Sequence, residues 1–253
     1  MLPFFRKIRF RLASENQLFK YARYAIGEIV LVVIGILIAL QINTWNEDRK
    51  LEKERLDILQ NLRSDFVNDL NNYRANIERL NKRQEVADEV LDLLENVPEV
   101  IDSVEVARKL LVIGFVEESN PSFATYNEIQ SSGKLGLLKS VELKKSLANL
   151  KSSVTEFRSI GTNWDEDIKD YERLISGHIS GNIPQQLLDT SIVVHVDNSN
   201  LRFDLQEIAQ DPEIIGRIRH ISYFTKMQVN IKHLIMVPTC EQIIEQIDSQ
   251  LAR

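Results

Sequence analysis

The chain has 253 residues, of which 43% are hydrophobic and 27% charged, and its formal net charge is −6. This composition excludes a disordered or collagen-like chain. Nine Gly and six Pro are few for this length, which disfavours turn-rich sandwiches and barrels and favours long helices. The single cysteine, Cys240, excludes an intrachain disulfide scaffold.

Charge is divided unevenly along the chain. Residues 1–27 hold six Lys and Arg side chains and one Glu, a charge of +5, which leaves −11 for the remainder. Within the basic leader, residues 1–23, the pattern over residues 3–12 indicates a short amphipathic helix in the membrane interface. Alternatively, its cations only set the membrane topology. The strongly acidic remainder makes nucleic acid a poor partner.

Residues 24–45 are the predicted transmembrane helix. They contain an unbroken apolar run over residues 29–40, and as a helix they rise ~33 Å, which exceeds the ~30 Å of a bilayer's hydrocarbon layer. Because the Lys and Arg excess precedes the span, we expect a cytoplasmic N-terminus and an extracytoplasmic domain over residues 46–253. An uncleaved anchor is favoured over a signal peptide, since no small-x-small cleavage site follows the run.

Two features within this span are candidates for function. Glu28 lies one turn inside it, where a carboxylate costs ~2.5–3.5 kcal/mol at the helix centre and less toward the interface. It either sits at the headgroup level or is an ion-coupling carboxylate that faces another helix. Gly35 and Ala39 form a small-x-x-x-small element, which favours association with a second helix.

The remaining chain predicts an all-α fold in which the transmembrane helix continues into an extended antiparallel coiled-coil or helical bundle. Long helices are expected over residues 47–97, 141–176 and 211–252, with a kink or break at Pro238. Each of these helices carries a seam, which is a row of mostly apolar side chains along one helix face. The first seam has a period of 3.5 and comprises Leu59, Leu62, Phe66, Leu70, Tyr73, Ile77, Leu80, Gln84, Ala87, Leu91 and Leu94. The second comprises Leu143, Leu147, Leu150, Val154, Phe157, Gly161, Trp164, Ile168, Tyr171 and Ile175. The third runs through Ile214, Ile218, Ile221, Phe224, Ile231, Leu234 and Ile235.

Two connections complete the predicted fold. Residues 102–135 form a helical insert, and residues 177–200 are interpreted as a loop around one β-branched run. Within the insert, Gly133 is placed to end a helix, with Phe123 and Tyr126 fastening the turn. The candidate interaction or structural motif consists of Phe123, Thr125, Tyr126, Asn127, Ser131, Ser132, Gly133 and Lys134.

The sequence contains no recognisable catalytic, metal-binding or phosphate-binding motif. The four histidines form no i, i+4 pair, Cys240 has no second thiol near it, and Gly133-Lys134 lacks the glycines of a phosphate-binding loop. We therefore assign no catalytic, cofactor-binding or metal-ligating residue and expect no cofactor.

Two stretches resemble a known family. These are YAIGEIVLVVIGILIALQIN at residues 24–43, with FFRKIR before it and WNE after it, and TYNEIQSSGKL at residues 125–135. They are similar to the corresponding parts of a family of uncharacterised single-pass membrane proteins from Bacteroidota, a DUF6090-like domain of unknown function. The resemblance implies the inner membrane of a Gram-negative cell, with the C-terminal domain in the periplasm, and no activity.

Two hypotheses for function follow. The first is a membrane-tethered, non-enzymatic domain that binds a protein or senses a periplasmic condition, with residues 123–135 as its contact surface. The partner is either another protein or a second copy of this chain, which would associate through the transmembrane and coiled-coil helices. The alternative is an accessory subunit of an ion-driven envelope complex, in which Glu28 is the intramembrane carboxylate.

Overall fold

One helix, α2, spans Leu18–Glu95 and carries both the apolar run and the first seam. The computed structural model describes residues 18–115, 121–179, 185–188, 191–194 and 204–252, so the helix predicted over residues 3–12 lies outside the described residues. The chain divides into two units, Met1–Asp57 and Ile58–Arg253. α2 enters both units, which confirms that the apolar run and the first seam are joined without a helix break.

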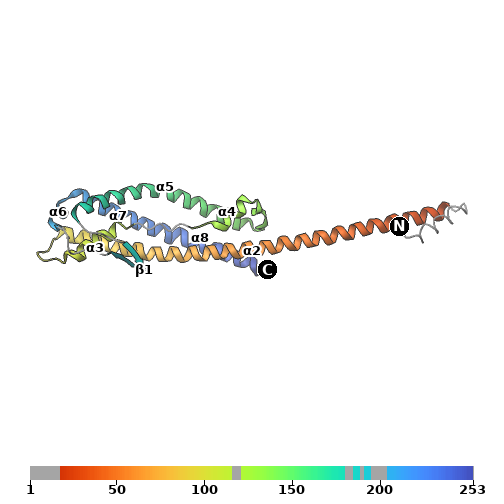
Figure 1. Ribbon diagram of the computed structural model, residues 1–253, viewed down its shortest axis with the longest axis horizontal. Coiled ribbons are helices and arrows are strands. Elements are labelled where there is room, and N and C mark those ends of the chain that lie inside the picture. The colour runs from red at the N-terminus through yellow and green to blue at the C-terminus, as the bar shows by residue number, and fades with distance from the viewer. Residues whose placement is uncertain (1–17, 116–120, 180–184, 189–190, 195–203, 253) are drawn as a thin grey trace. The chain divides into compact units, whose positions relative to one another are not determined.

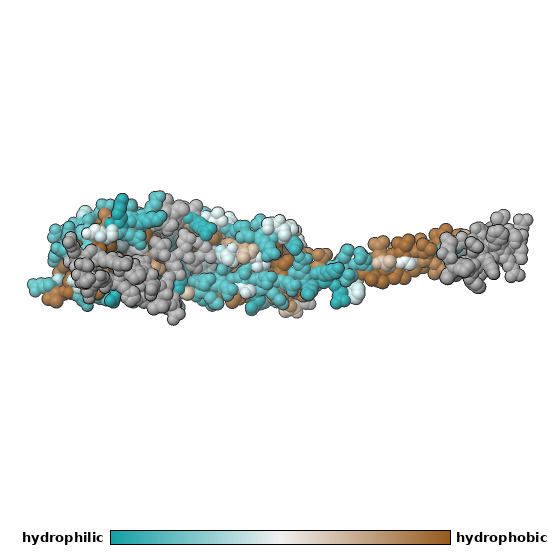
Figure 2. All heavy atoms as spheres, viewed as in Figure 1, coloured by the Kyte–Doolittle hydropathy of each residue, from teal (hydrophilic) through white to brown (hydrophobic). Residues whose placement is uncertain are grey.

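The first unit contains the candidate membrane span. A helix that is long and apolar enough to cross a membrane starts at Ala22, and no residue of its apolar window is buried against protein. Figure 2 shows this stretch of α2 as an apolar surface. A helix of this length and hydropathy near the N-terminus is a candidate for a membrane anchor or a signal sequence.

The second unit is a helical bundle (Figure 1). Along the chain after α2 it comprises α3 Ser103–Ile113, α4 Ala124–Ser131, the 3₁₀ helix η1 Lys134–Leu137, α5 Val141–His178, β1 Gln185–Leu188, β2 Ser191–Val194, α6 Leu205–Gln210, α7 Pro212–Ile231, the π-helical segment η3 Lys232–Met236 and α8 Val237–Leu251. Two of its long helices begin directly after side chains that cap a helix N-terminus. Ser140 Oγ accepts from Leu143 N at 3.1 Å, and Asp211 Oδ1 accepts from Glu213 N at 2.8 Å.

Ion pairs show how the long helices are aligned. Along α2, Arg63 pairs with Asp248 and Arg74 with Glu241, both at 2.6 Å, and Glu95 pairs with Arg219 at 3.3 Å. Since the partner's number falls as the α2 number rises, α7 and α8 run antiparallel to α2. α7 and α8 also pack along α5 (Figure 1). The antiparallel bundle predicted from the seams is therefore confirmed.

Two apolar clusters form the core of the bundle. The proximal cluster is built on residues 58–73 of α2, with the start of α5, the end of the chain and α4. The distal cluster is built on residues 86–94 of α2, with α3, the end of α5, α6 and the start of α7. The second seam supplies both clusters, as expected, with Leu143 and Leu147 in the first and Tyr171 and Ile175 in the second.

The first seam changes register beyond Tyr73. The sequence predicted Ile77, Gln84 and Leu91 in the buried row, but these three are only partly buried, and the neighbouring positions Asn76, Arg83 and Val90 are buried instead. The other predicted positions on this stretch are buried as expected: Leu80, Ala87 and Leu94. Both rows advance by threes and fours, so periodicity alone does not separate them. Two polar side chains therefore enter the interior between the apolar clusters.

The third helix also differs from its prediction. A kink or a break was predicted at Pro238. The chain stays helical through the proline, so there is no break, and the π-helical segment η3 lies directly before α8. A π turn takes an additional residue and so rotates the following side chains. Consequently Met236 enters the core, whereas the predicted core residues Leu234 and Ile235 are 69% and 40% exposed.

The loop interpretation of residues 177–200 is wrong in part. α5 continues to His178, and β1 pairs antiparallel with β2, with Leu187 opposite Ile192. The partner strand that the β-branched run required is the QQLL segment immediately before it. Sequence analysis missed it because Gln and Leu do not favour strands on their own.

Candidate functional site

The candidate motif packs against α2 through the start of helix α4. Two carboxylates of α2 accept hydrogen bonds from backbone N–H groups at this point. Thr125 N, in the first turn of α4, donates to Asp65 Oδ2 at 3.1 Å, and Ser122 N, just before the helix, donates to Asp69 Oδ1 at 3.4 Å. Carboxylates near a helix N-terminus satisfy its donors and interact favourably with its dipole. Two acids that sequence analysis did not single out therefore hold the motif in place.

Aromatic side chains anchor the same segment in the proximal cluster. Phe123 and Tyr126 are buried, and the Phe123 ring lies 6.3 Å from that of Phe66 in an edge-on arrangement. Phe123 adopts a φ of 47°, a left-handed conformation that few non-glycine residues adopt. The predicted fastening role of these two aromatic residues is thus seen directly.

The outer face of α4 is organised by Lys151 of α5. Its ammonium donates to Asn127 Oδ1 at 2.7 Å and to Gln130 Oε1 at 3.1 Å, and it lies 5.2 Å from the centre of the Tyr126 ring. Asn127, Ser131, Ser132 and Lys134 are exposed. The motif therefore combines a buried anchor with a polar outer surface.

The end of α4 is closed by its own residues. Ser131 and Ser132 both donate through Oγ to the Glu128 carbonyl, at 3.0 and 2.8 Å, and Gly133 follows with a φ of 72°. This left-handed glycine is the helix stop that the sequence predicted.

We expect Gly133→Val to lower the free energy of unfolding by roughly 1–2 kcal/mol, because a β-branched residue strains a left-handed backbone. No neighbour lies within 4 Å of an added Cβ, so the cost is conformational rather than steric. Gly136→Ala is the matched control, since Gly136 is equally open and has no positive φ. Denaturant unfolding of both variants measures the difference, and equal stabilities would contradict the assignment.

A buried polar group lies next to this motif in the proximal cluster. Burial, with a smaller contribution from the nearby Asp65 charge, raises the pKa of Asp69 to about 6, although the Ser122 backbone hydrogen bond opposes this shift. Burial likewise raises the pKa of Cys240 to about 12, with Asp69 and Glu241 adding to it, and it raises that of Tyr73. Cys240 is buried in the proximal cluster, and its thiol is protonated at neutral pH.

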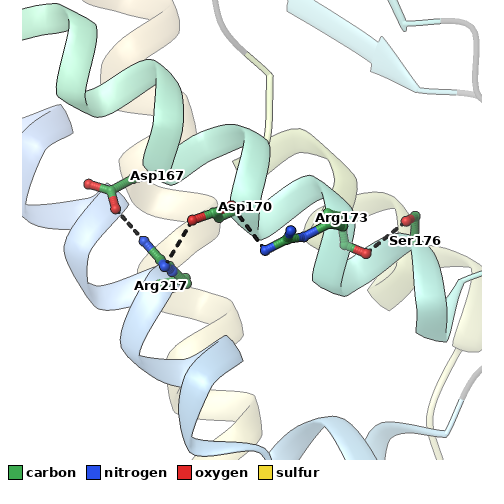
Figure 3. A network of polar contacts seen from close by, with 5 residues as sticks. All are labelled: Asp167, Asp170, Arg173, Ser176 and Arg217. Carbon is green, nitrogen blue, oxygen red and sulfur yellow. Dashed lines mark hydrogen bonds and ion pairs between the residues drawn. The ribbon is translucent and has the colours of Figure 1, made fainter.

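A second polar network fastens α5 to α7 (Figure 3). Arg217 bridges Asp167 and Asp170, and the Asp170 contact measures 3.0 Å. His220 Nδ1 lies 2.8 Å from Asp167 Oδ2. The Asp167 side chain is largely covered by these contacts. The network links two helices by charge, and the described residues hold no group of three or more His, Cys, Asp or Glu suited to a metal ion.

The intramembrane candidates lie on α2, in the first unit. Glu28 is partly covered, while Gly35 and Ala39 are exposed along the apolar stretch. An added Cβ at Gly35 would meet no atom within 4 Å, so the position is open for a second helix to approach. Association through this face and ion coupling by Glu28 stay predictions.

A family model of unknown function, DUF6090, matches residues 28–174. The chain belongs to this family. No curated protein and no solved structure matches it. The DUF6090 region includes the whole apolar run, α3, α4 and nearly all of α5, and therefore both the motif and its anchoring acids. The third long helix of the bundle lies beyond the matched region.

Proposed function

We propose that this DUF6090 protein is a membrane-tethered, non-enzymatic interaction or sensing module of the bacterial envelope, with its helical bundle in the periplasm. One observation carries the proposal: on one helix, the apolar side chains of residues 29–40 are exposed, while those beyond residue 58 form a bundle core. Lipid is the solvent that such a stretch requires. The basic leader before it favours a cytoplasmic N-terminus.

The outer face of α4 supports the choice of contact surface. Its polar side chains are held at fixed positions by Lys151 and by the aromatic anchor beneath them, as a preorganised binding surface requires. A partner protein that presents hydrogen-bonding groups fits this surface, because Asn127, Ser131 and Ser132 supply both donors and acceptors. Oligomer formation through Gly35 and Ala39 is a compatible second mode of association.

Crosslinking in intact membranes tests this proposal. The full chain is expressed with an affinity tag, treated with a reversible crosslinker, purified in mild detergent and analysed by mass spectrometry. We expect the variant Asn127→Ala with Lys134→Ala to melt like the wild type and to lose its heterologous partner. The control variant Asn149→Ala with Lys169→Ala, which alters exposed positions of α5, should keep the partner. Retention of every partner by the first variant would show that the motif is structural only.

A further inference from the structure

Helix α4 is a short element between two residues with a left-handed backbone. Phe123 precedes it with a φ of 47°, and Gly133 follows it with a φ of 72°. The helix lies beside the start of α5 (Figure 1), and three of its eight residues are buried: Thr125, Tyr126 and Ile129. A short segment with few buried side chains is the kind of element that opens locally while the rest of a fold stays intact.

The attachment of this helix to α2 includes a carboxyl group that is only half satisfied. Asp69 is 6% exposed, and its Oδ1 accepts from Ser122 N over a long distance, 3.4 Å. Its Oδ2 is buried and has no hydrogen-bond partner. Burying a carboxylate costs far more than burying a neutral carboxyl group unless a cation or hydrogen bonds compensate the charge. The ionised form of Asp69 therefore opposes the closed position of residues 121–131, which we call the α4 segment.

No cation of the described residues pairs with Asp69. The titratable groups on the elements around it are Asp65 and Tyr73 on α2, Tyr126 and Glu128 on α4, Lys151 on α5, and Cys240 and Glu241 on α8. The two cations of this region have other acceptors, because Arg74 binds Glu241 and Lys151 binds side-chain oxygens of α4. The buried charge is therefore relieved either by taking up a proton or by opening of the segment.

We propose that the α4 segment is a pH-sensitive switch, which is closed against α2 when Asp69 is protonated and opens more often when Asp69 is ionised. In the open state water hydrates the Asp69 carboxylate, so loss of the proton shifts the equilibrium toward opening. Because closing raises the pKa of Asp69 to about 6, the closed state is favoured in acid and loses this advantage as the pH rises from about 4 to about 6.

This inference deepens the proposed function and rests on it for one consequence. The outer face of α4 is the proposed contact surface, and its side chains keep their positions only while the segment is closed. Binding of a partner at this face should therefore be stronger in mild acid than at neutral pH. The opening itself needs no partner, so it can be measured on the protein alone.

Hydrogen exchange of the full chain in detergent micelles, followed by mass spectrometry, tests the switch. Wild type and Asp69→Asn are compared at the same pH, so that the intrinsic exchange rates of the amides cancel. The amides to follow are those of residues 127–132, whose hydrogen bonds close α4. We expect equal rates below about pH 4. At neutral pH the wild type should exchange faster by up to about a hundredfold, the factor that corresponds to a pKa raised from 3.8 to about 6.

Two controls show whether the opening is local and due to Asp69. Low concentrations of urea should leave the exchange of α4 unchanged, whereas they accelerate exchange that requires global unfolding, as expected for residues 143–154 of α5. Glu128→Gln removes an exposed acid from the same helix and should keep the pH dependence of the wild type.

Three results would overturn the switch. They are equal exchange of α4 in wild type and Asp69→Asn at neutral pH, a difference between them that does not change with pH, and an exchange of α4 that depends on urea as α5 does. None of these results bears on the partner test with Asn127→Ala and Lys134→Ala, because no partner is present in the exchange experiment. Failure of the switch and failure of the proposed function are thus distinguished.

Discussion

Replacing Tyr171 by alanine is expected to lower the free energy of unfolding by about 3–5 kcal/mol, the range for removing a large buried aromatic side chain. Tyr171 is 0% exposed and lies in the distal cluster, between α2, α3 and the start of α7. Its hydroxyl donates to the Leu110 carbonyl at 2.7 Å. Leu110 lies in the last turn of α3, where carbonyls have no helical donor, so the substitution removes both packing and a cap.

Two further variants separate these contributions. Tyr171→Phe keeps the ring and removes only the cap, so we expect a loss of about 1–3 kcal/mol. Tyr223→Ala alters a tyrosine that is 63% exposed and should change the stability by less than about 0.5 kcal/mol. Denaturant unfolding of the full chain in detergent measures all three. If Tyr171→Ala were as stable as Tyr223→Ala, the distal cluster would not be part of the core.

Asp69→Asn is expected to stabilise the protein at neutral pH by up to about 3 kcal/mol, which corresponds to the difference between a pKa of about 6 and the ordinary 3.8. Because folding raises the pKa of this carboxyl, the folded state binds its proton more tightly than the unfolded state does. The wild type therefore loses stability as the pH rises from about 4 to about 6, and this loss persists above pH 6. The amide carries no charge, and its oxygen can still accept from Ser122 N.

Unfolding of wild type and variant at a series of pH values measures this effect. The two stabilities should converge below about pH 4, where the Asp69 carboxyl is protonated in the folded and the unfolded state, and diverge toward neutral pH. Asp65→Ala serves as the reference, since it removes the acceptor for Thr125 N and should cost about 1 kcal/mol at neutral pH. A difference between wild type and Asp69→Asn that does not change with pH would refute the raised pKa.

The helices were predictable where apolar spacing and end residues agree. In α5, the Ser140 cap and the leucines of the second seam leave one amphipathic face, and the helix begins where expected. In α2, two overlapping rows share the period of 3.5 beyond Tyr73, and apolar character favoured the row with Ile77. The burial of Arg83 depends on Phe115 and Thr225, which lie far away in the sequence.

In the candidate motif, too, contacts between residues close in the sequence were predictable and contacts between distant residues were not. Gly133, Phe123 and Tyr126 were found from local spacing, because a helix stop and its anchors are close in the sequence. Asp65 and Asp69 were not, since they meet the motif across 60 and 53 residues. Only the register of α2 against α4 brings them together, and no local pattern encodes that register.

Labelling of intact cells tests the central claim, a membrane tether with an extracytoplasmic bundle, most directly. A membrane-impermeant maleimide is applied after permeabilising the outer membrane, to chains that carry either Ser132→Cys on the exposed end of α4 or Ser14→Cys in the leader. The native thiol of Cys240 is buried and protonated, so it should stay unlabelled. We predict labelling of Cys at position 132 in intact cells and of position 14 only after lysis. Labelling of position 14 in intact cells, with position 132 protected, would contradict the account.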